Sequence, residues 1–169
     1  MTFKAIVGIV LGAMLANNYA LEKFLGAAPL LGWSTQGKKV TALGSSVTIA
    51  MLFTAILAAL VQEFVLDVHS LGYLQTLVYA AIVLIVVYAM ELVAKIGGKS
   101  LGIYFPIIAL NSAVLGVAVN NAADGLSLGV SILTAWGAGM GFWLALAAFA
   151  AACECGLDGE RAAAGISRF

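Results

Sequence analysis

Charged residues are scarce in this chain, and their scarcity excludes most soluble folds. Of 169 residues, 8 are Lys or Arg and 8 are Asp or Glu, whereas 63% are hydrophobic and the mean hydropathy is +1.10. A soluble domain could not bury so much apolar side-chain surface. The net charge is zero and no basic run exceeds Lys38-Lys39, so nothing in the composition indicates a nucleic-acid partner.

Cysteine and histidine are nearly absent as well. Cys153 and Cys155 are too few for a disulfide framework. Because a Cys-x-Cys pair alone lacks enough ligands for a closed metal site, we interpret the two residues as thiols at a helix end. The single histidine, His69, falls in a predicted loop, where we expect a solvated side chain. The sequence therefore predicts no metal site and no catalytic residue of its own.

Long uncharged runs separate the few polar clusters. Four runs are long enough to cross about 30 Å of hydrocarbon as helices, and a fifth is at the short end of that range. Helices and closed barrels alone satisfy their backbone in lipid, and these runs do not alternate as barrel strands do. The sequence predicts an all-α polytopic membrane protein with about five transmembrane helices, forming one integral membrane domain over residues 1–169. The predicted spans are Ala5–Leu21, Val40–Gln62, Ser70–Met90, Ser100–Ala123 and Gly125–Cys153.

The basic residues fall mainly on one side of this predicted membrane. If Ala5–Leu21 crosses first, Lys4 shares its side with the acids of the loops, and the other basic residues lie opposite. The positive-inside rule then places the N-terminus outside and the C-terminus in the cytoplasm. The opposite side carries Lys38, Lys39, Lys95, Lys99, Arg161 and Arg168, and the N-terminal side carries Glu63, Asp67 and Asp124.

Proline is rarer still, and the two prolines occupy related motifs. Pro29 and Pro106 each follow a Leu-Gly pair, Leu25-Gly26 or Leu101-Gly102, and each precedes two branched aliphatic residues. An odd number of spans separates the motifs, so they would enter the membrane from opposite sides, as in an inverted-topology repeat. The uncharged stretch Phe24–Gly37 is too short to cross, and we interpret it as a re-entrant or half-helix element.

Interrupted helices at membrane depth have a specific physical consequence. Proline frees a carbonyl group and glycine permits irregular backbone, and in lipid such groups must be buried in protein or face a polar cavity. Two half-helices that meet near the midplane are therefore the expected place for a cofactor, an ion or a substrate. The repeat halves would cover residues 1–93 and 99–153, followed by a cytoplasmic tail, 154–169. The alternative is that the prolines only kink helices and the small residues only permit close packing.

Several amides lie within or at the ends of the apolar runs. Asn17, Asn18 and Asn111 each need a hydrogen-bond partner there, so they are candidates for an ion path or for interhelical hydrogen bonds. Asn120-Asn121 we interpret as the end of a span.

One acid, Glu91, is close to the membrane on a predicted helix. Lys95 follows four residues later, which favours a helical ion pair. The other interpretation is a proton or coupling-ion site.

Several motifs together resemble one known family. They are similar to the A subunit of Rnf electron-transport complexes, in a family that includes the E subunit of the sodium-pumping NADH:quinone reductase. The segments are Leu15–Gly26 (LANNYALEKFLG), Pro29–Gly32 (PLLG), Leu101–Ala118 (LGIYFPIIALNSAVLGVA), Tyr73–Leu77 (YLQTL) and Met90–Val93 (MELV).

The resemblance implies a core membrane subunit, not catalytic alone, within an ion-translocating oxidoreductase of a bacterial-type inner membrane. Its partners would be a homologous subunit of opposite topology and the other subunits of the complex. In this family the two homologous subunits share an intramembrane 2Fe–2S cluster at the broken helices, each supplying two cysteines. The corresponding positions here are Gly26, Ala27, Ala28, Asn111 and Ser112.

This chain departs from the family pattern in two respects. Ala28 and Ser112 stand where the family has its ligand cysteines, so the scaffold is retained without the usual iron ligands. The family's sixth span is also absent, because the chain ends at Ser167-Arg168-Phe169, as expected of a truncated or a divergent member.

A different class of protein fits the same scaffold. The alternative is a small secondary transporter or channel-like protein without a redox cofactor. Its site would be formed by backbone at the Pro29 and Pro106 breaks, together with Asn18, Asn111 and Ser112. A third possibility is an assembly factor or inactive paralogue.

Overall fold

The regular secondary structure of the described residues is entirely helical. The computed structural model describes residues 3–23, 25–26, 37–69, 72–98, 102 and 104–163, and no strand occurs among them. Two of the short elements, η1 and η2, are π-helical turns that continue α1 and α3, and η3 is a 3₁₀ turn. The elements are α1 (Phe3–Leu11), η1 (Gly12–Ala16), α3 (Gly37–Val61), η2 (Gln62–Leu66), η3 (Gly72–Leu74), α4 (Gln75–Ile96), α5 (Tyr104–Ala109), α6 (Ser112–Ala123) and α7 (Leu128–Ala163).

Helix lengths confirm the polytopic prediction. Four segments are long and apolar enough to cross a membrane: Val40–Leu66, Gly72–Ile96, Tyr104–Ala123 and Leu128–Cys153. The first helical segment, Phe3–Ala16, is also apolar but shorter. The first segment ends five residues before the predicted boundary at Leu21, at the Asn17-Asn18 pair. Asparagine side chains compete for backbone hydrogen bonds, which explains why the helix stops there.

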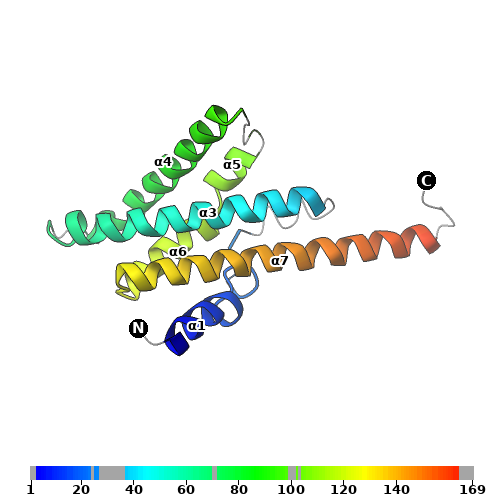
Figure 1. The fold of residues 1–169 in the computed structure, drawn as a ribbon, viewed down its shortest axis with the longest axis horizontal. Helices are drawn as coiled ribbons and strands as arrows, with labels where there is room; N and C mark the ends of the chain where they lie inside the picture. The colour runs from blue at the N-terminus through cyan, green and yellow to red at the C-terminus, as the bar shows by residue number, and fades with distance from the viewer. Residues whose placement is uncertain are drawn as a thin grey trace.

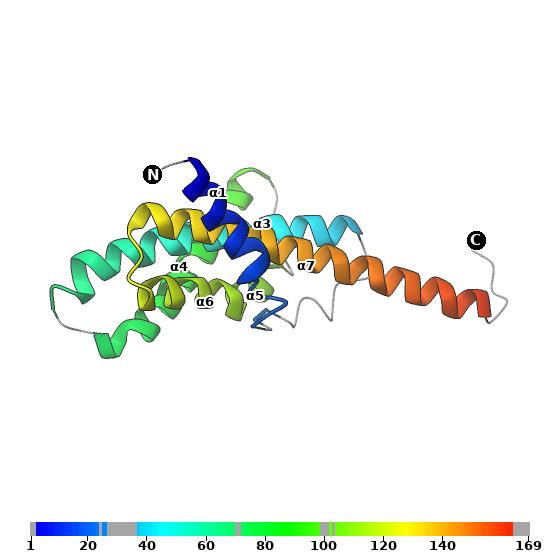
Figure 2. The same ribbon diagram turned by 90° about the horizontal axis from the view of Figure 1, so that it is seen from below.

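Helices α3 and α7 form the centre of the bundle. They lie side by side, with α1 against α7 and with α4 and α6 against α3 (Figures 1 and 2). Glycines permit the close approach of the central pair. A Cβ at Gly44 would overlap the Trp143 ring, and one at Gly139 would lie 2.6 Å from Thr48. Fully buried side chains fill the remaining interior, among them Leu43, Val47, Met51, Phe142 and Leu146.

One end of the bundle carries three acidic residues. The chain start, the η2 turn and the beginning of α7 share one end, which we call the acidic end because it carries Glu63, Asp67 and Asp124 (Figure 1). Helix α7 continues past Cys153 to Ala163 and projects beyond the other helices at the opposite end (Figures 1 and 2). Its 36 residues correspond to about 54 Å, which exceeds a hydrocarbon core of about 30 Å.

The predicted break in the second half exists, but not at the proline. Pro106 is the third residue of α5. The backbone N–H groups of a helix's first turn have no acceptor within the helix, so a proline, which lacks an N–H, is tolerated there. The helix ends at Ala109 and restarts at Ser112, so the interruption is Leu110-Asn111. The first predicted half-helix, Phe24–Gly37 with Pro29, lies outside the described residues except for Leu25, Gly26 and Gly37.

Candidate functional site at the helix interruptions

The first interruption is organised by Asn18. Its side chain is 3% exposed, and its Oδ1 accepts hydrogen bonds from the N–H groups of Ala20 (3.0 Å) and Leu21 (3.2 Å). Its Nδ2 donates to the carbonyl oxygens of Met14 (3.0 Å) and Gly141 (2.9 Å). The amide thus satisfies the backbone on both sides of the break and also ties the break to α7.

The second interruption uses the same device. Asn111 is the N-cap of α6, and its Oδ1 accepts a hydrogen bond from the N–H of Ala113 at 2.9 Å. The residue is 4% exposed, and its buried Nδ2 has no hydrogen-bond partner in the described structure. In both breaks, therefore, an asparagine accepts from the backbone two residues later.

The two interruptions meet at Gly26. Its N–H donates to Ser112 Oγ at 2.9 Å, across 86 residues of sequence. Gly26 has φ +73°, and a Cβ there would lie 2.6 Å from Asn111 Oδ1 and 2.8 Å from Phe142 Cε2. The structure therefore brings together Gly26, Asn111 and Ser112 of the predicted site, whereas Ala27 and Ala28 lie outside the described residues. We call this contact the junction.

Comparison with known proteins identifies the family of this chain. Residues 6–164 match the family described as "Rnf-Nqr subunit, membrane protein". The chain is 37% identical over 149 residues to the A subunit of the Na⁺-translocating ferredoxin:NAD⁺ oxidoreductase complex of Acetobacterium woodii, covering 86% of this chain and 78% of that protein. It is 36% identical over 151 residues to the A subunit of the ion-translocating oxidoreductase complex of Syntrophotalea carbinolica, covering 87% and 78%. This chain belongs to the Rnf-Nqr family.

The junction of this Rnf-Nqr subunit does not fit an iron–sulfur cluster held by its own side chains. A 2Fe–2S cluster needs thiolate ligands, and the Ser112 hydroxyl already accepts the Gly26 N–H. Cys153 lies eleven residues beyond Phe142 on α7, about 16 Å along the helix. Among the described residues, no three His, Cys, Asp or Glu side chains are grouped so that they could hold a metal ion.

The other predicted polar residues of this protein lie elsewhere. Asn17 is exposed and lines a cavity of about 380 Å³ that also contacts Lys23 and Asp124. Glu91 is 8% exposed on α4, and its Oε1 is 3.3 Å from Lys95 Nζ. The predicted helical ion pair is confirmed, and neither residue belongs to the contacts described for the junction.

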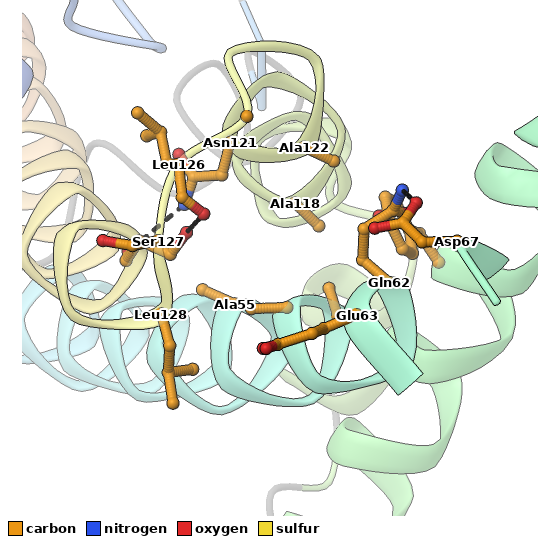
Figure 3. A pocket seen from close by; sticks show the side chains of 15 residues that line it. Ala55, Gln62, Glu63, Asp67, Ala118, Asn121, Ala122, Leu126, Ser127 and Leu128 are labelled. Atoms are coloured by element: carbon orange, nitrogen blue, oxygen red, sulfur yellow. Dashed lines mark hydrogen bonds between the residues drawn. The ribbon is translucent and has the colours of Figure 1, made fainter. Parts of the chain in front are cut away.

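Sequence reasoning missed a second cavity of the Rnf-Nqr subunit, at the acidic end. Its volume is about 470 Å³, and it lies between α3, η2, α4, α6 and the start of α7 (Figure 3). Asn121, interpreted from the sequence only as the end of a span, is 5% exposed and lines this cavity. The available signals were the two acids Glu63 and Asp67 and the alanine-rich Ala55–Ala59 segment, but no linear pattern joins them to Asn121.

Proposed function

We propose that this chain is a core membrane subunit of an ion-translocating electron-transport complex of the Rnf type. The observation that carries the proposal is the identity of 35–37% to proteins named as the A subunit of such complexes, over 84–87% of this chain. The family match spans residues 6–164 and so includes both interruptions. The chain would act as a scaffold and as part of the ion path, not as a catalyst alone.

The proposed partner at the junction is a homologous subunit of opposite topology. Asn111 supports this assignment, because its buried Nδ2 donor lacks an acceptor in the described part of this chain. An acceptor from a neighbouring subunit would satisfy the donor. The charge distribution supports an inner-membrane orientation with the acidic end outside and the end of α7 in the cytoplasm.

Electron transfer is assigned to the other subunits. Ala28 and Ser112 supply no thiolate, so a cluster shared at this place would lack both ligands from this chain. We therefore propose that this protein retains the architecture of the junction while the redox centres reside in its partners.

Purification from native membranes tests the proposal. A tagged chain should copurify with a homologous membrane subunit and with flavin- or iron-bearing subunits, and the complex should couple electron transfer to cation uptake in proteoliposomes. A stable homo-oligomer without such subunits would contradict the assignment.

One observation favours a second candidate, a transporter without a redox cofactor. The junction is closed by the Ser112–Gly26 hydrogen bond in place of metal ligands. Measuring cation flux through the purified chain alone, reconstituted in liposomes, distinguishes the two functions. Under the proposed function it moves no ion by itself, whereas cation flux through the isolated chain would favour the transporter.

A further inference from the structure

The segment between Asn18 and Gly26 lies at the middle of the membrane-spanning helices. Asn18 Nδ2 donates to the carbonyl oxygen of Gly141, which is about halfway along the candidate span of α7. Gly26 N–H donates to Ser112 Oγ, about halfway along the span formed by α5 and α6. Both ends of the segment are therefore held near the centre of a hydrocarbon core of about 30 Å.

Two charged residues of this segment are exposed. They are Glu22 and Lys23, and neither forms an ion pair among the described residues. Glu22 N–H donates to the Asn18 carbonyl oxygen at 2.8 Å, so the backbone here is a compact turn that stays beside its anchors. Charged side chains at this depth face protein or a water-filled space, because lipid tails cannot solvate them.

The Lys23 ammonium group remains inside the hydrocarbon region. Its Nζ lies 4.9 Å from the centroid of the Tyr19 ring, which is the distance of a cation–π contact. The ring packs on α6, since a Cβ at Gly116 would lie 3.5 Å from Tyr19 Cδ1. Gly116 precedes Asp124 of the acidic end by eight residues, which is about 12 Å of helix. The aromatic contact thus keeps the charge well away from the membrane surface.

Lys23 lines an open cavity beside α1. This is the cavity of about 380 Å³ that exposed Asn17 also lines, and we call it the α1 cavity. Among the described residues of its lining, Lys23 is the only base, and the only acid is Asp124 at the acidic end. The described lining therefore offers Lys23 no carboxylate at its own depth.

Two glycines of the first helical segment open onto the same cavity. Gly8 and Gly12 line it four residues apart, and a Cβ at either position would meet nothing within 4 Å. Gly137 and Gly141, a pair of the same spacing on α7, are instead covered by the backbone of α1 and η1. Glycines at this spacing let helices approach closely in membranes. The face at Gly8 and Gly12 therefore has the shape that a further helix would fit.

We infer that the α1 cavity receives a membrane-spanning helix of another protein subunit, which packs on Gly8 and Gly12 and carries a carboxylate beside Lys23. Lipid tails would offer Lys23 no anion and the exposed Asn17 amide no hydrogen bond, whereas such a helix supplies both. Docking of a helix follows from the cavity and its charge. The assignment of that helix to an Rnf-type complex rests on the proposed function.

Photocrosslinking in native membranes tests the inference. A tagged full-length chain with Ile9→p-benzoylphenylalanine, in the cavity lining, should crosslink to a membrane-spanning peptide of a different chain that contains Asp or Glu. Lys23→Met should lower the crosslinked yield about tenfold or more, because breaking a buried charge pair weakens binding at least that much. Amidation of the partner's carboxylate by Asn or Gln substitution should do the same, and Lys23→Arg should retain the yield. Crosslinks to lipid alone, to a second copy of this chain, or to no molecule would overturn the inference.

A pair of glycine variants separates docking from folding. Gly12→Leu fills the α1 cavity and should lower recovery of the partner with the tagged chain about tenfold. Gly129→Leu changes an exposed glycine outside the lining and should leave recovery unchanged. A Cβ at either glycine meets open space, so both isolated variants should melt at the wild-type temperature.

The outcomes distinguish this inference from the proposed function. Equal recovery of Rnf-type subunits by Gly12→Leu and Gly129→Leu would overturn docking in the α1 cavity and leave the proposed function standing. A Lys23-dependent crosslink to a helix of a protein outside such a complex would contradict the proposed function and support docking.

Discussion

At the residue scale, position 26 has room for a hydrogen atom and little else. We expect Gly26→Ala to lower the free energy of unfolding by about 2–5 kcal/mol. A left-handed alanine costs roughly 1–2 kcal/mol, and overpacking against Asn111 and Phe142 adds about 1–3 kcal/mol. Thermal unfolding of the detergent-solubilised protein measures the change.

Gly98→Ala is the matched control for this substitution. Gly98 has φ +72°, but a Cβ there would meet no atom within 4 Å. It should therefore show only the conformational part of the loss. Equal destabilisation by the two variants would mean that the tight contact at the junction is absent.

Replacing either of two threonines of α3 by valine should change the stability of the protein in opposite directions. Thr54 is fully buried and its Oγ1 has no hydrogen-bond partner in the described structure, whereas Thr48 Oγ1 donates to the Gly44 carbonyl oxygen at 2.8 Å. Thr54→Val removes an unsatisfied hydroxyl and should raise stability by about 1 kcal/mol, while Thr48→Val should lower it by about 0.5–1 kcal/mol. The unfolding midpoints of the two variants, measured in the same detergent, give the comparison. A lower stability of Thr54→Val would contradict the absence of a hydrogen-bond partner for Thr54 Oγ1.

At the element scale, the packing of α1 on α7 depends on two glycines one turn apart. A Cβ at Gly137 would lie 2.7 Å from the Val10 carbonyl oxygen, and one at Gly141 would lie 2.6 Å from that of Met14. Because both obstacles are backbone atoms, either alanine substitution must separate the helices, and we expect a loss of about 1–3 kcal/mol.

The control for this pair lies on the same helix. Gly129→Ala meets nothing within 4 Å and should be neutral or slightly stabilising, since alanine favours helix by roughly 1 kcal/mol over glycine. Melting temperatures and the yield of monodisperse protein on size exclusion report the difference. Similar behaviour of all three variants would exclude close packing of α1 on α7.

The interruptions show which part of an element can be predicted from sequence. Span lengths follow from hydrophobicity and charge, and the meeting of Gly26 with Asn111 and Ser112 agrees with the paired-motif hypothesis. The position of the second break was wrong, because Pro106 lies in a first turn and the chain restarts at the Asn111 cap. The acidic-end cavity was missed because its lining comes from α3, η2, α4, α6 and the start of α7, segments that no pattern in the sequence links to one another.

At the scale of the whole molecule, the proposed orientation predicts opposite labelling of two sites. Helix α4, the α5–α6 segment and helix α7 lie between exposed His69 and exposed Cys155, which amounts to three membrane crossings. A membrane-impermeant maleimide should label Cys155 from the cytoplasmic side. In a variant with His69→Cys, Cys153→Ser and Cys155→Ser, it should label position 69 from the outer side. Labelling of both sites from one side would contradict this topology.

The unbroken course of α7 from Leu128 to Ala163 has a consequence beyond the bilayer. Because the helix is continuous, the packing of α7 within the bundle fixes the direction in which each side chain of its protruding end faces. Inserting one residue after Leu157 would turn everything that follows by about 100°, whereas seven residues would restore the direction to within about 20°. The side chains of the protruding end of α7 therefore face fixed directions relative to the bundle. In an assembled complex, a neighbouring subunit would contact this end only if the correct face of the helix pointed toward it, whatever the length of the helix.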